Sequence, residues 1–280
     1  MEADGHKRMP LVCALEFFGT MLFVFGILST NLAISIPFSL LASVVIFGDV
    51  TGGHFNPAVT IGVYIQEGKY ATNFLFMVLI IIAQCLGGLA AMGPAWLGGF
   101  TDSGLAYDTV DGKFNGSAKI LAPFNPIQGT PDQYGVDTPG SLDFTMDLQV
   151  CINEVICSFM FISVILMVKG KKTAGERKGI GAAMCVVLTL LCVISGTNKF
   201  GACFNPAVGI SLTSSQILYN GSKHYLYHYL YAYTLGPALG GLFAGLFHIL
   251  HAGLCDEKPP EENREFPHDQ KETFLGNNNH

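Results

Sequence analysis

The heptapeptide GHFNPAV at residues 53–59 recurs as ACFNPAV at residues 202–208. Five consecutive residues, FNPAV, are identical in the two copies. Asparagine is a favoured helix N-cap, and proline suits the first helical turn because it has no N–H to lose. Each copy therefore predicts a helix start, and the two short helices are expected over roughly residues 56–65 and 205–214.

The composition around these motifs is that of a membrane protein. Half of the 280 residues are hydrophobic and only 13% are charged, whereas an average soluble domain has about 25% charged residues. These values exclude a soluble enzyme, a disordered protein and a nucleic-acid binder. Because a helix needs about 20 apolar residues to cross the hydrocarbon core, six segments are predicted to span the membrane. They are residues 10–33, 37–50, 72–98, 147–168, 179–195 and 224–252.

These segments divide the chain into two similar halves. A tail over residues 1–9 precedes a membrane domain over 10–252, and a polar tail over 253–280 follows it. The first repeat covers about residues 10–98 and the second about 147–252, with a long exposed loop over 99–145 between them. Each repeat has three spans, so the second copy is predicted to enter the membrane with inverted topology.

The two short helices are too short to cross the membrane and are expected to re-enter it from opposite sides. Their N-termini would then meet near the midplane, where irregular backbone is tolerated only if it lines a cavity. The positive ends of both helix dipoles and the amides of Asn56 and Asn205 would point to one place. Such an arrangement predicts a pathway that orients water and repels cations.

The basic residues predict the orientation of the spans. Lysine and arginine occur in the N-terminal tail and in the loop after the fourth span, at residues 169–178. With six spans, both termini and this loop share one side of the membrane. The positive-inside rule makes that side cytoplasmic, or the matrix if the membrane is mitochondrial.

The chain resembles the aquaporin, or major intrinsic protein, family over about residues 10–252. The resemblance rests on EFFGT at residues 16–20, GGHFNPAVTIG at 52–62, QCLGG at 84–88, Glu154, and FGACFNPAV at 200–208. It implies an all-α membrane protein with six tilted helices, two re-entrant half-helices and a pore in each subunit, usually of a homotetramer. It also implies that six residues form the pore motifs: Asn56, Pro57, Ala58, Asn205, Pro206 and Ala207. Glu16 and Glu154 match buried glutamates that accept hydrogen bonds from the re-entrant loops, and His54 is a further loop-packing candidate.

The selectivity filter departs from the family pattern. Most members have arginine after the second Asn-Pro-Ala, where this chain has Val208, and the aspartate of glycerol facilitators is replaced by Gly209. Counting back from the motifs places Ile36 or, in another register, Phe38 at the second-span position of the filter. The predicted filter is therefore aliphatic, and its candidates are Ile36, Val193, Ala202 and Val208.

Two functions remain open from the sequence. The first is a passive channel for water or a small neutral solute. The second is a weakly conducting or non-conducting structural subunit of a larger membrane complex, possibly a mitochondrial one. The expected partners are membrane lipids, the permeating solute, and either three further copies of the chain or other subunits. No enzyme activity, cofactor, metal site or nucleic-acid binding is expected.

Overall fold

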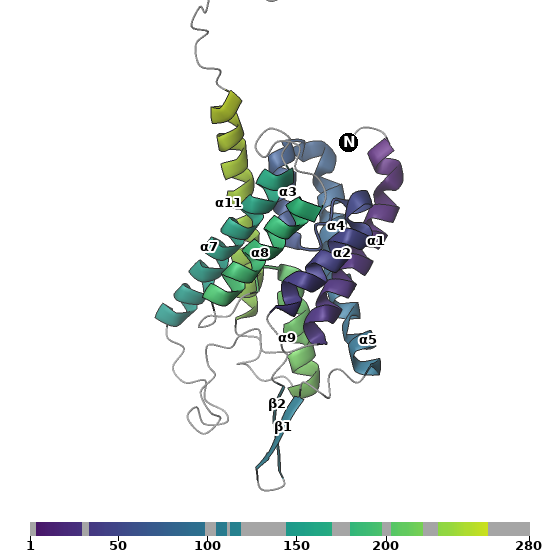
Figure 1. Cartoon of the computed structure of the whole chain (residues 1–280), viewed down its shortest axis with the longest axis vertical. Helices are drawn as coiled ribbons and strands as arrows, with labels where there is room; N and C mark the ends of the chain where they lie inside the picture. Colours follow the sequence, from purple (N-terminus) through teal and green to yellow (C-terminus); the bar gives the residue numbers. More distant parts are fainter. Residues whose placement is uncertain are drawn as a thin grey trace, which may run out of the picture.

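The computed structural model describes residues 4–29, 34–98, 105–110, 113–118, 144–169, 180–197, 203–220 and 229–256. It is a bundle of roughly aligned helices (Figure 1). Four long apolar helical stretches have the length and composition of membrane spans, and two shorter apolar helices accompany them. The long ones are α1 (Asp4–Leu28), α4 (Tyr70–Ala90) continued by α5 (Met92–Leu97), α7 (Phe144–Lys169) and α11 (Leu230–Asp256), and the shorter ones are α2 (Ser35–Thr51) and α8 (Ile180–Gly196).

Two further helices begin at the repeated motif. They are α3 (Pro57–Glu67) and α9 (Pro206–Asn220). Both start at the proline, one residue after the expected start, and α3 ends two residues and α9 six residues later than expected. The six predicted spans and two half-helices are thus present, and the all-α membrane fold is confirmed.

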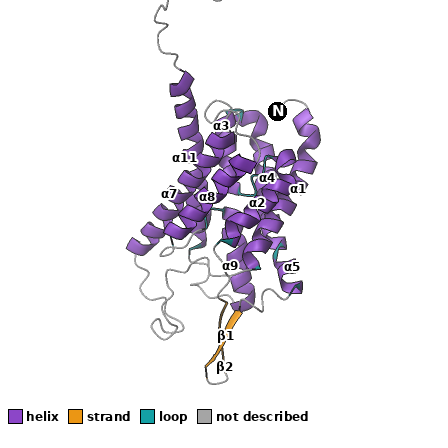
Figure 2. Cartoon of the chain, viewed as in Figure 1, coloured by secondary structure: helices purple, strands orange, loops and turns teal. Residues whose placement is uncertain are grey.

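The long segment between the repeats contains structure that was expected to be loop. Strands β1 (Leu105–Val110) and β2 (Lys113–Ala118) form an antiparallel hairpin in which Leu105 pairs with Ala118. The hairpin projects from one end of the bundle, outside the helical domain (Figure 2). Its connecting sequence is Asp111-Gly112, a dipeptide that favours two-residue hairpin turns.

The first helix begins, and the last helix ends, on the same side of the bundle, as an even number of spans requires. The start of α1 and the end of α11 lie at one end of the bundle, and the hairpin lies at the other (Figure 1). We refer to these as the terminal end and the hairpin end.

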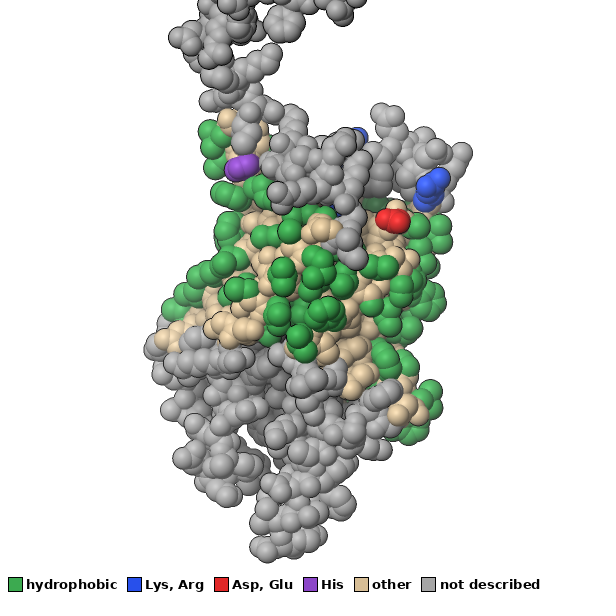
Figure 3. Space-filling model, viewed as in Figure 1, with side chains coloured by type: hydrophobic (Ala, Val, Ile, Leu, Met, Phe, Trp, Pro, Cys, Tyr) green, Lys and Arg blue, Asp and Glu red, His purple; other side chains and the backbone are tan. Residues whose placement is uncertain are grey.

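The outer surface of the bundle is apolar. Hydrophobic side chains cover its middle, and the charged side chains visible on this face lie near the terminal end (Figure 3). Leu75, Ile82 and Leu250 are among many large hydrophobic residues that are about half exposed or more. Such a surface is unfavourable in water and matches the hydrocarbon of a bilayer.

Candidate functional site

The two half-helices begin with the same asparagine cap. Asn56 has extended backbone angles (φ −159°, ψ 118°), and its Oδ1 accepts a hydrogen bond from the Ala58 amide at 2.8 Å. The Oδ1 atom of Asn205 accepts from the Ala207 amide at 2.9 Å. The prolines that follow, Pro57 and Pro206, are the first helical residues. Each cap therefore pairs one of the N–H groups that would otherwise have no hydrogen-bond partner at its own helix tip.

The same two asparagines join the half-helices to each other. The Nδ2 atom of Asn56 donates to the Phe204 carbonyl at 2.8 Å, and the Nδ2 atom of Asn205 donates to the Phe55 carbonyl at 2.9 Å. Both asparagines are nearly fully buried. The helix tips are therefore held against each other by a reciprocal pair of hydrogen bonds. Each amide group carries a second N–H that these bonds do not use.

The phenylalanines before the caps have unusual backbone angles. Phe55 has φ of 45° and Phe204 has φ of 52°, in the left-handed region that side-chain-bearing residues rarely adopt. Such a conformation costs on the order of 1–3 kcal/mol and persists only where the surroundings impose it. It turns each phenylalanine carbonyl toward the opposite asparagine, which explains why both motifs share it.

Two buried glutamates hold these strained segments in place. The carboxylate of Glu16 in α1 accepts from the His54 amide at 3.0 Å and the Phe55 amide at 2.8 Å. The carboxylate of Glu154 in α7 accepts from the Cys203 and Phe204 amides, both at 2.9 Å. Neither glutamate is exposed. Each carboxylate accepts from two backbone N–H groups that lie outside the helices. Without it, these groups would be unpaired at membrane depth.

The first half has an additional polar network. Gln84 in α4 donates from Nε2 to Glu16 Oε2 at 2.8 Å and lies 2.9 Å from Thr60 Oγ1. The ring Nδ1 of His54 lies 3.2 Å from the same hydroxyl, so His54 packs within the loop. Gln84 and Thr60 were not among the predicted site residues. The signal in the sequence was a glutamine inside a long apolar span.

Glycines let the third span of each half approach the half-helix of the other. A Cβ atom at Gly241 in α11 would overlap the Ala58 carbonyl of α3. A Cβ atom at Gly88 in α4 would overlap the Ser211 hydroxyl of α9 and lie 3.1 Å from the Ala207 carbonyl. The two half-helices are therefore clamped in equivalent ways by opposite repeats.

The candidate filter residues lie in or beside the apolar core. Val193 and Val208 are buried, and Ile36 is half-buried against the same cluster. Phe38 is 49% exposed and therefore faces away from that cluster. Ala202 lies outside the described residues. Among the residues that the structure describes, no group of histidine, cysteine or carboxylate side chains could hold a metal ion.

Replacing either cap is expected to destabilise the junction. Asn56→Ala and Asn205→Ala each remove a cap and one cross-connection, so each should lower the free energy of unfolding by about 1–3 kcal/mol. The double variant should lose less than the sum, because both residues serve one junction. Thermal unfolding in detergent measures this, with Asn73→Ala as a control that removes a side-chain hydrogen bond to Glu67, the last residue of α3, instead of one at the helix tips. Additive effects in the double variant would contradict the reciprocal arrangement.

Comparison with known proteins places this geometry in a family. The family model described as "Major intrinsic protein" matches residues 7–248. The chain is 26% identical over 256 residues to Aquaporin-B of Dictyostelium discoideum, and the alignment covers 81% of each protein. It is 42% identical over 59 residues to an uncharacterized aquaporin-like protein of Haemophilus influenzae, which is 21% of this chain and 26% of that protein.

A solved structure supports the fold. The aquaglyceroporin from Plasmodium falciparum superimposes with a TM-score of 0.65 and 18% sequence identity, covering 89% of this chain and 99% of that one. The family match extends over nearly the whole helical bundle, including both half-helices. The chain therefore belongs to the major intrinsic protein family, whose members are membrane channels for water or small solutes.

Proposed function

We propose that this protein is a passive channel for water or a small neutral solute, with an aliphatic constriction that slows water. The observation that carries the proposal is the junction of the half-helices, in which Asn56 and Asn205 bond reciprocally and each retains a second N–H. These donors and the two helix tips would orient a permeating molecule without charge. They would also oppose the passage of cations.

The proposed constriction lies beside this junction, on the hairpin side. Val208 is the third residue of α9, which extends from the junction toward the hairpin end (Figure 1). Val193 belongs to the same buried cluster, and Ile36 packs against it. We propose that these three side chains and Ala202 narrow the path without offering a polar side-chain group. Water passing there would rely on backbone carbonyls for hydrogen bonds.

We further propose that both termini face the cytoplasm, or the matrix in a mitochondrial membrane. The basic loop at residues 169–178 and the shared position of the α1 start and α11 end support this orientation. A homotetramer is the proposed assembly. The second candidate, a non-conducting subunit of a larger complex, is decided by the same experiment.

Reconstitution tests the proposed function. An unpaired polar group costs about 1–3 kcal/mol, and each 1.4 kcal/mol of barrier slows a rate about tenfold. Stopped-flow light scattering on proteoliposomes should therefore show water permeability about tenfold or more below that of a water-selective member at equal protein density. The permeability to glycerol should not exceed the permeability to urea.

The controls separate the two candidate functions. Protein-free liposomes set the background for every solute. Water flux at the level of the water-selective member would contradict the aliphatic constriction. Flux at background for all solutes, together with other chains co-purifying in the native assembly, would favour the structural subunit.

A further inference from the structure

A lysine reaches the segment that leads to the first half-helix. Lys169 is the last residue of α7, and its Nζ atom donates a hydrogen bond to the Gly52 carbonyl. Gly52 follows the end of α2 and has φ of 88°, a conformation that turns the chain inward toward Asn56. The ammonium group therefore lies where the re-entrant segment leaves the bundle surface.

His54 borders the same position. An ideal Cβ atom at Gly52 would lie 3.9 Å from Lys169 Nζ and 3.4 Å from His54 Nε2. Both side chains therefore border the same point of the re-entrant segment, and the backbone amide of His54 donates to the carboxylate of Glu16. Lys169 thus belongs to the polar network of the first half-helix, although it comes from the opposite repeat.

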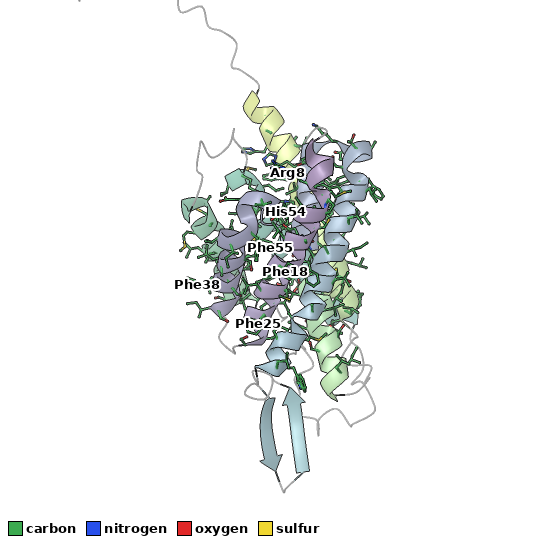
Figure 4. The ribbon with its side chains drawn as sticks, turned by 90° about the vertical axis from the view of Figure 1, so that its right-hand side faces the viewer. Arg8, Phe18, Phe25, Phe38, His54 and Phe55 are labelled. Atoms are coloured by element: carbon green, nitrogen blue, oxygen red, sulfur yellow. The ribbon has the colours of Figure 1, made fainter. Side chains whose placement is uncertain are left out.

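The lysine and Val208 lie on opposite sides of the asparagine junction. Helices α2 and α7 both finish at the terminal end, whereas α9 extends from the junction toward the hairpin end (Figure 1). Figure 4 shows the depth along the first half: Arg8 lies near the terminal end, His54 lies below it, and Phe55 lies deeper. Lys169 therefore lies on the terminal-end side of the junction, beside the segment that leads to Asn56.

We infer that Lys169 is a selectivity residue that excludes cations at the terminal-end mouth. This role rests on the proposed channel function. Backbone carbonyls that leave regular structure are good ligands for cations. The ammonium group occupies the Gly52 carbonyl and adds a fixed positive charge beside it. It thereby supplies, at one mouth, a charge that Val208 cannot supply at the other.

A purely structural clamp is the competing role, and side-chain chemistry separates the two. Arginine at position 169 keeps both the charge and a donor for Gly52. Glutamine keeps a donor without the charge, and methionine keeps neither. A clamp predicts that glutamine behaves like lysine, whereas a selectivity role predicts that glutamine behaves like methionine.

The experiment measures proton and potassium flux into proteoliposomes loaded with a pH-sensitive or potassium-sensitive dye. Lys169→Met and Lys169→Gln should raise cation flux about tenfold or more. Charges that line a narrow opening change the local ion concentration and the entry rate by at least about that factor. Lys169→Arg should stay near the wild type. Arg8→Met is the matched control, because it removes an exposed positive charge from the same end of the bundle, and it should also stay near the wild type.

Two results would overturn the inference. One is unchanged cation flux in Lys169→Met, whatever the water flux, in protein whose thermal unfolding matches the wild type. The other is wild-type cation flux in Lys169→Gln, which would leave only a clamp. Failure of the proposed channel function would appear separately, as wild-type water flux no higher than in protein-free liposomes.

Discussion

Replacing Glu16 with alanine is expected to cost more stability than any other single truncation in the first repeat. The change leaves three donors without their acceptor: the amides of His54 and Phe55 and the side chain of Gln84. Each unpaired buried donor costs about 1–3 kcal/mol, so the free energy of unfolding should fall by at least about 3 kcal/mol. The strained backbone of Phe55 would also lose the contact that holds it.

Thermal or denaturant unfolding in detergent measures this effect, and two variants calibrate it. Glu154→Ala should be less severe, because the Glu154 carboxylate accepts from two backbone amides, whereas Glu16 also accepts from Gln84. Glu67→Ala removes an exposed carboxylate that accepts from one side chain, Asn73, and should cost about 1 kcal/mol, because it leaves one donor without its acceptor. A loss for Glu16→Ala no larger than that of Glu67→Ala would show that the carboxylate does not support the loop.

Enlarging Gly241 is expected to displace the first half-helix. The first added carbon would overlap the carbonyl oxygen of Ala58, a backbone atom at the helix tip that cannot rotate away. Overpacking usually costs about 1–3 kcal/mol. Because the clash here is with backbone, Gly241→Val should cost about 3 kcal/mol or more and separate the tips of α3 and α9.

Two glycines provide the comparison for Gly241→Val. Gly88→Val should be milder, because its closest neighbour is the side-chain hydroxyl of Ser211, which can change rotamer. Gly253 lies on the same helix as Gly241, and a Cβ atom there would meet none of the described residues within 4 Å, so the stability of Gly253→Val should stay near the wild type. Equal unfolding temperatures for Gly241→Val and Gly253→Val would contradict the close approach of α11 to α3.

The sequence predicted those features that depend on local chemistry and on simple periodicity. Long apolar runs predicted the spans, because the bilayer fixes their length. The two Asn-Pro pairs predicted the starts of α3 and α9, because capping and proline preferences act within one turn. The asparagine cross-connections follow once the two halves are placed in inverted orientation.

Other features depend on contacts between distant segments and gave weaker signals. The sequence did not separate Ile36 from Phe38, because most of α2 is apolar and its central polar residues, Ser39 and Ser43, are small side chains that can be buried as well as exposed. Gln84 acquires its role only when α4 lies beside Glu16. The sequence assigned Lys169 to a basic loop. Its contact with the Gly52 carbonyl depends on where α7 ends. The hairpin signal at Asp111-Gly112 was present but lay within a segment that looked like loop.

The osmotic water permeability of wild-type vesicles, compared with that of Val208→Thr vesicles, tests most directly whether an aliphatic constriction limits conduction. Valine and threonine have nearly the same shape, but threonine has a hydroxyl in place of one methyl group, and that hydroxyl can donate and accept hydrogen bonds. Replacing one hydrogen bond that water must otherwise forgo should raise permeability about tenfold. Slow flux in the wild type and a clear rise in Val208→Thr are the expected results. Fast flux in the wild type, with no change in Val208→Thr, would contradict the aliphatic constriction.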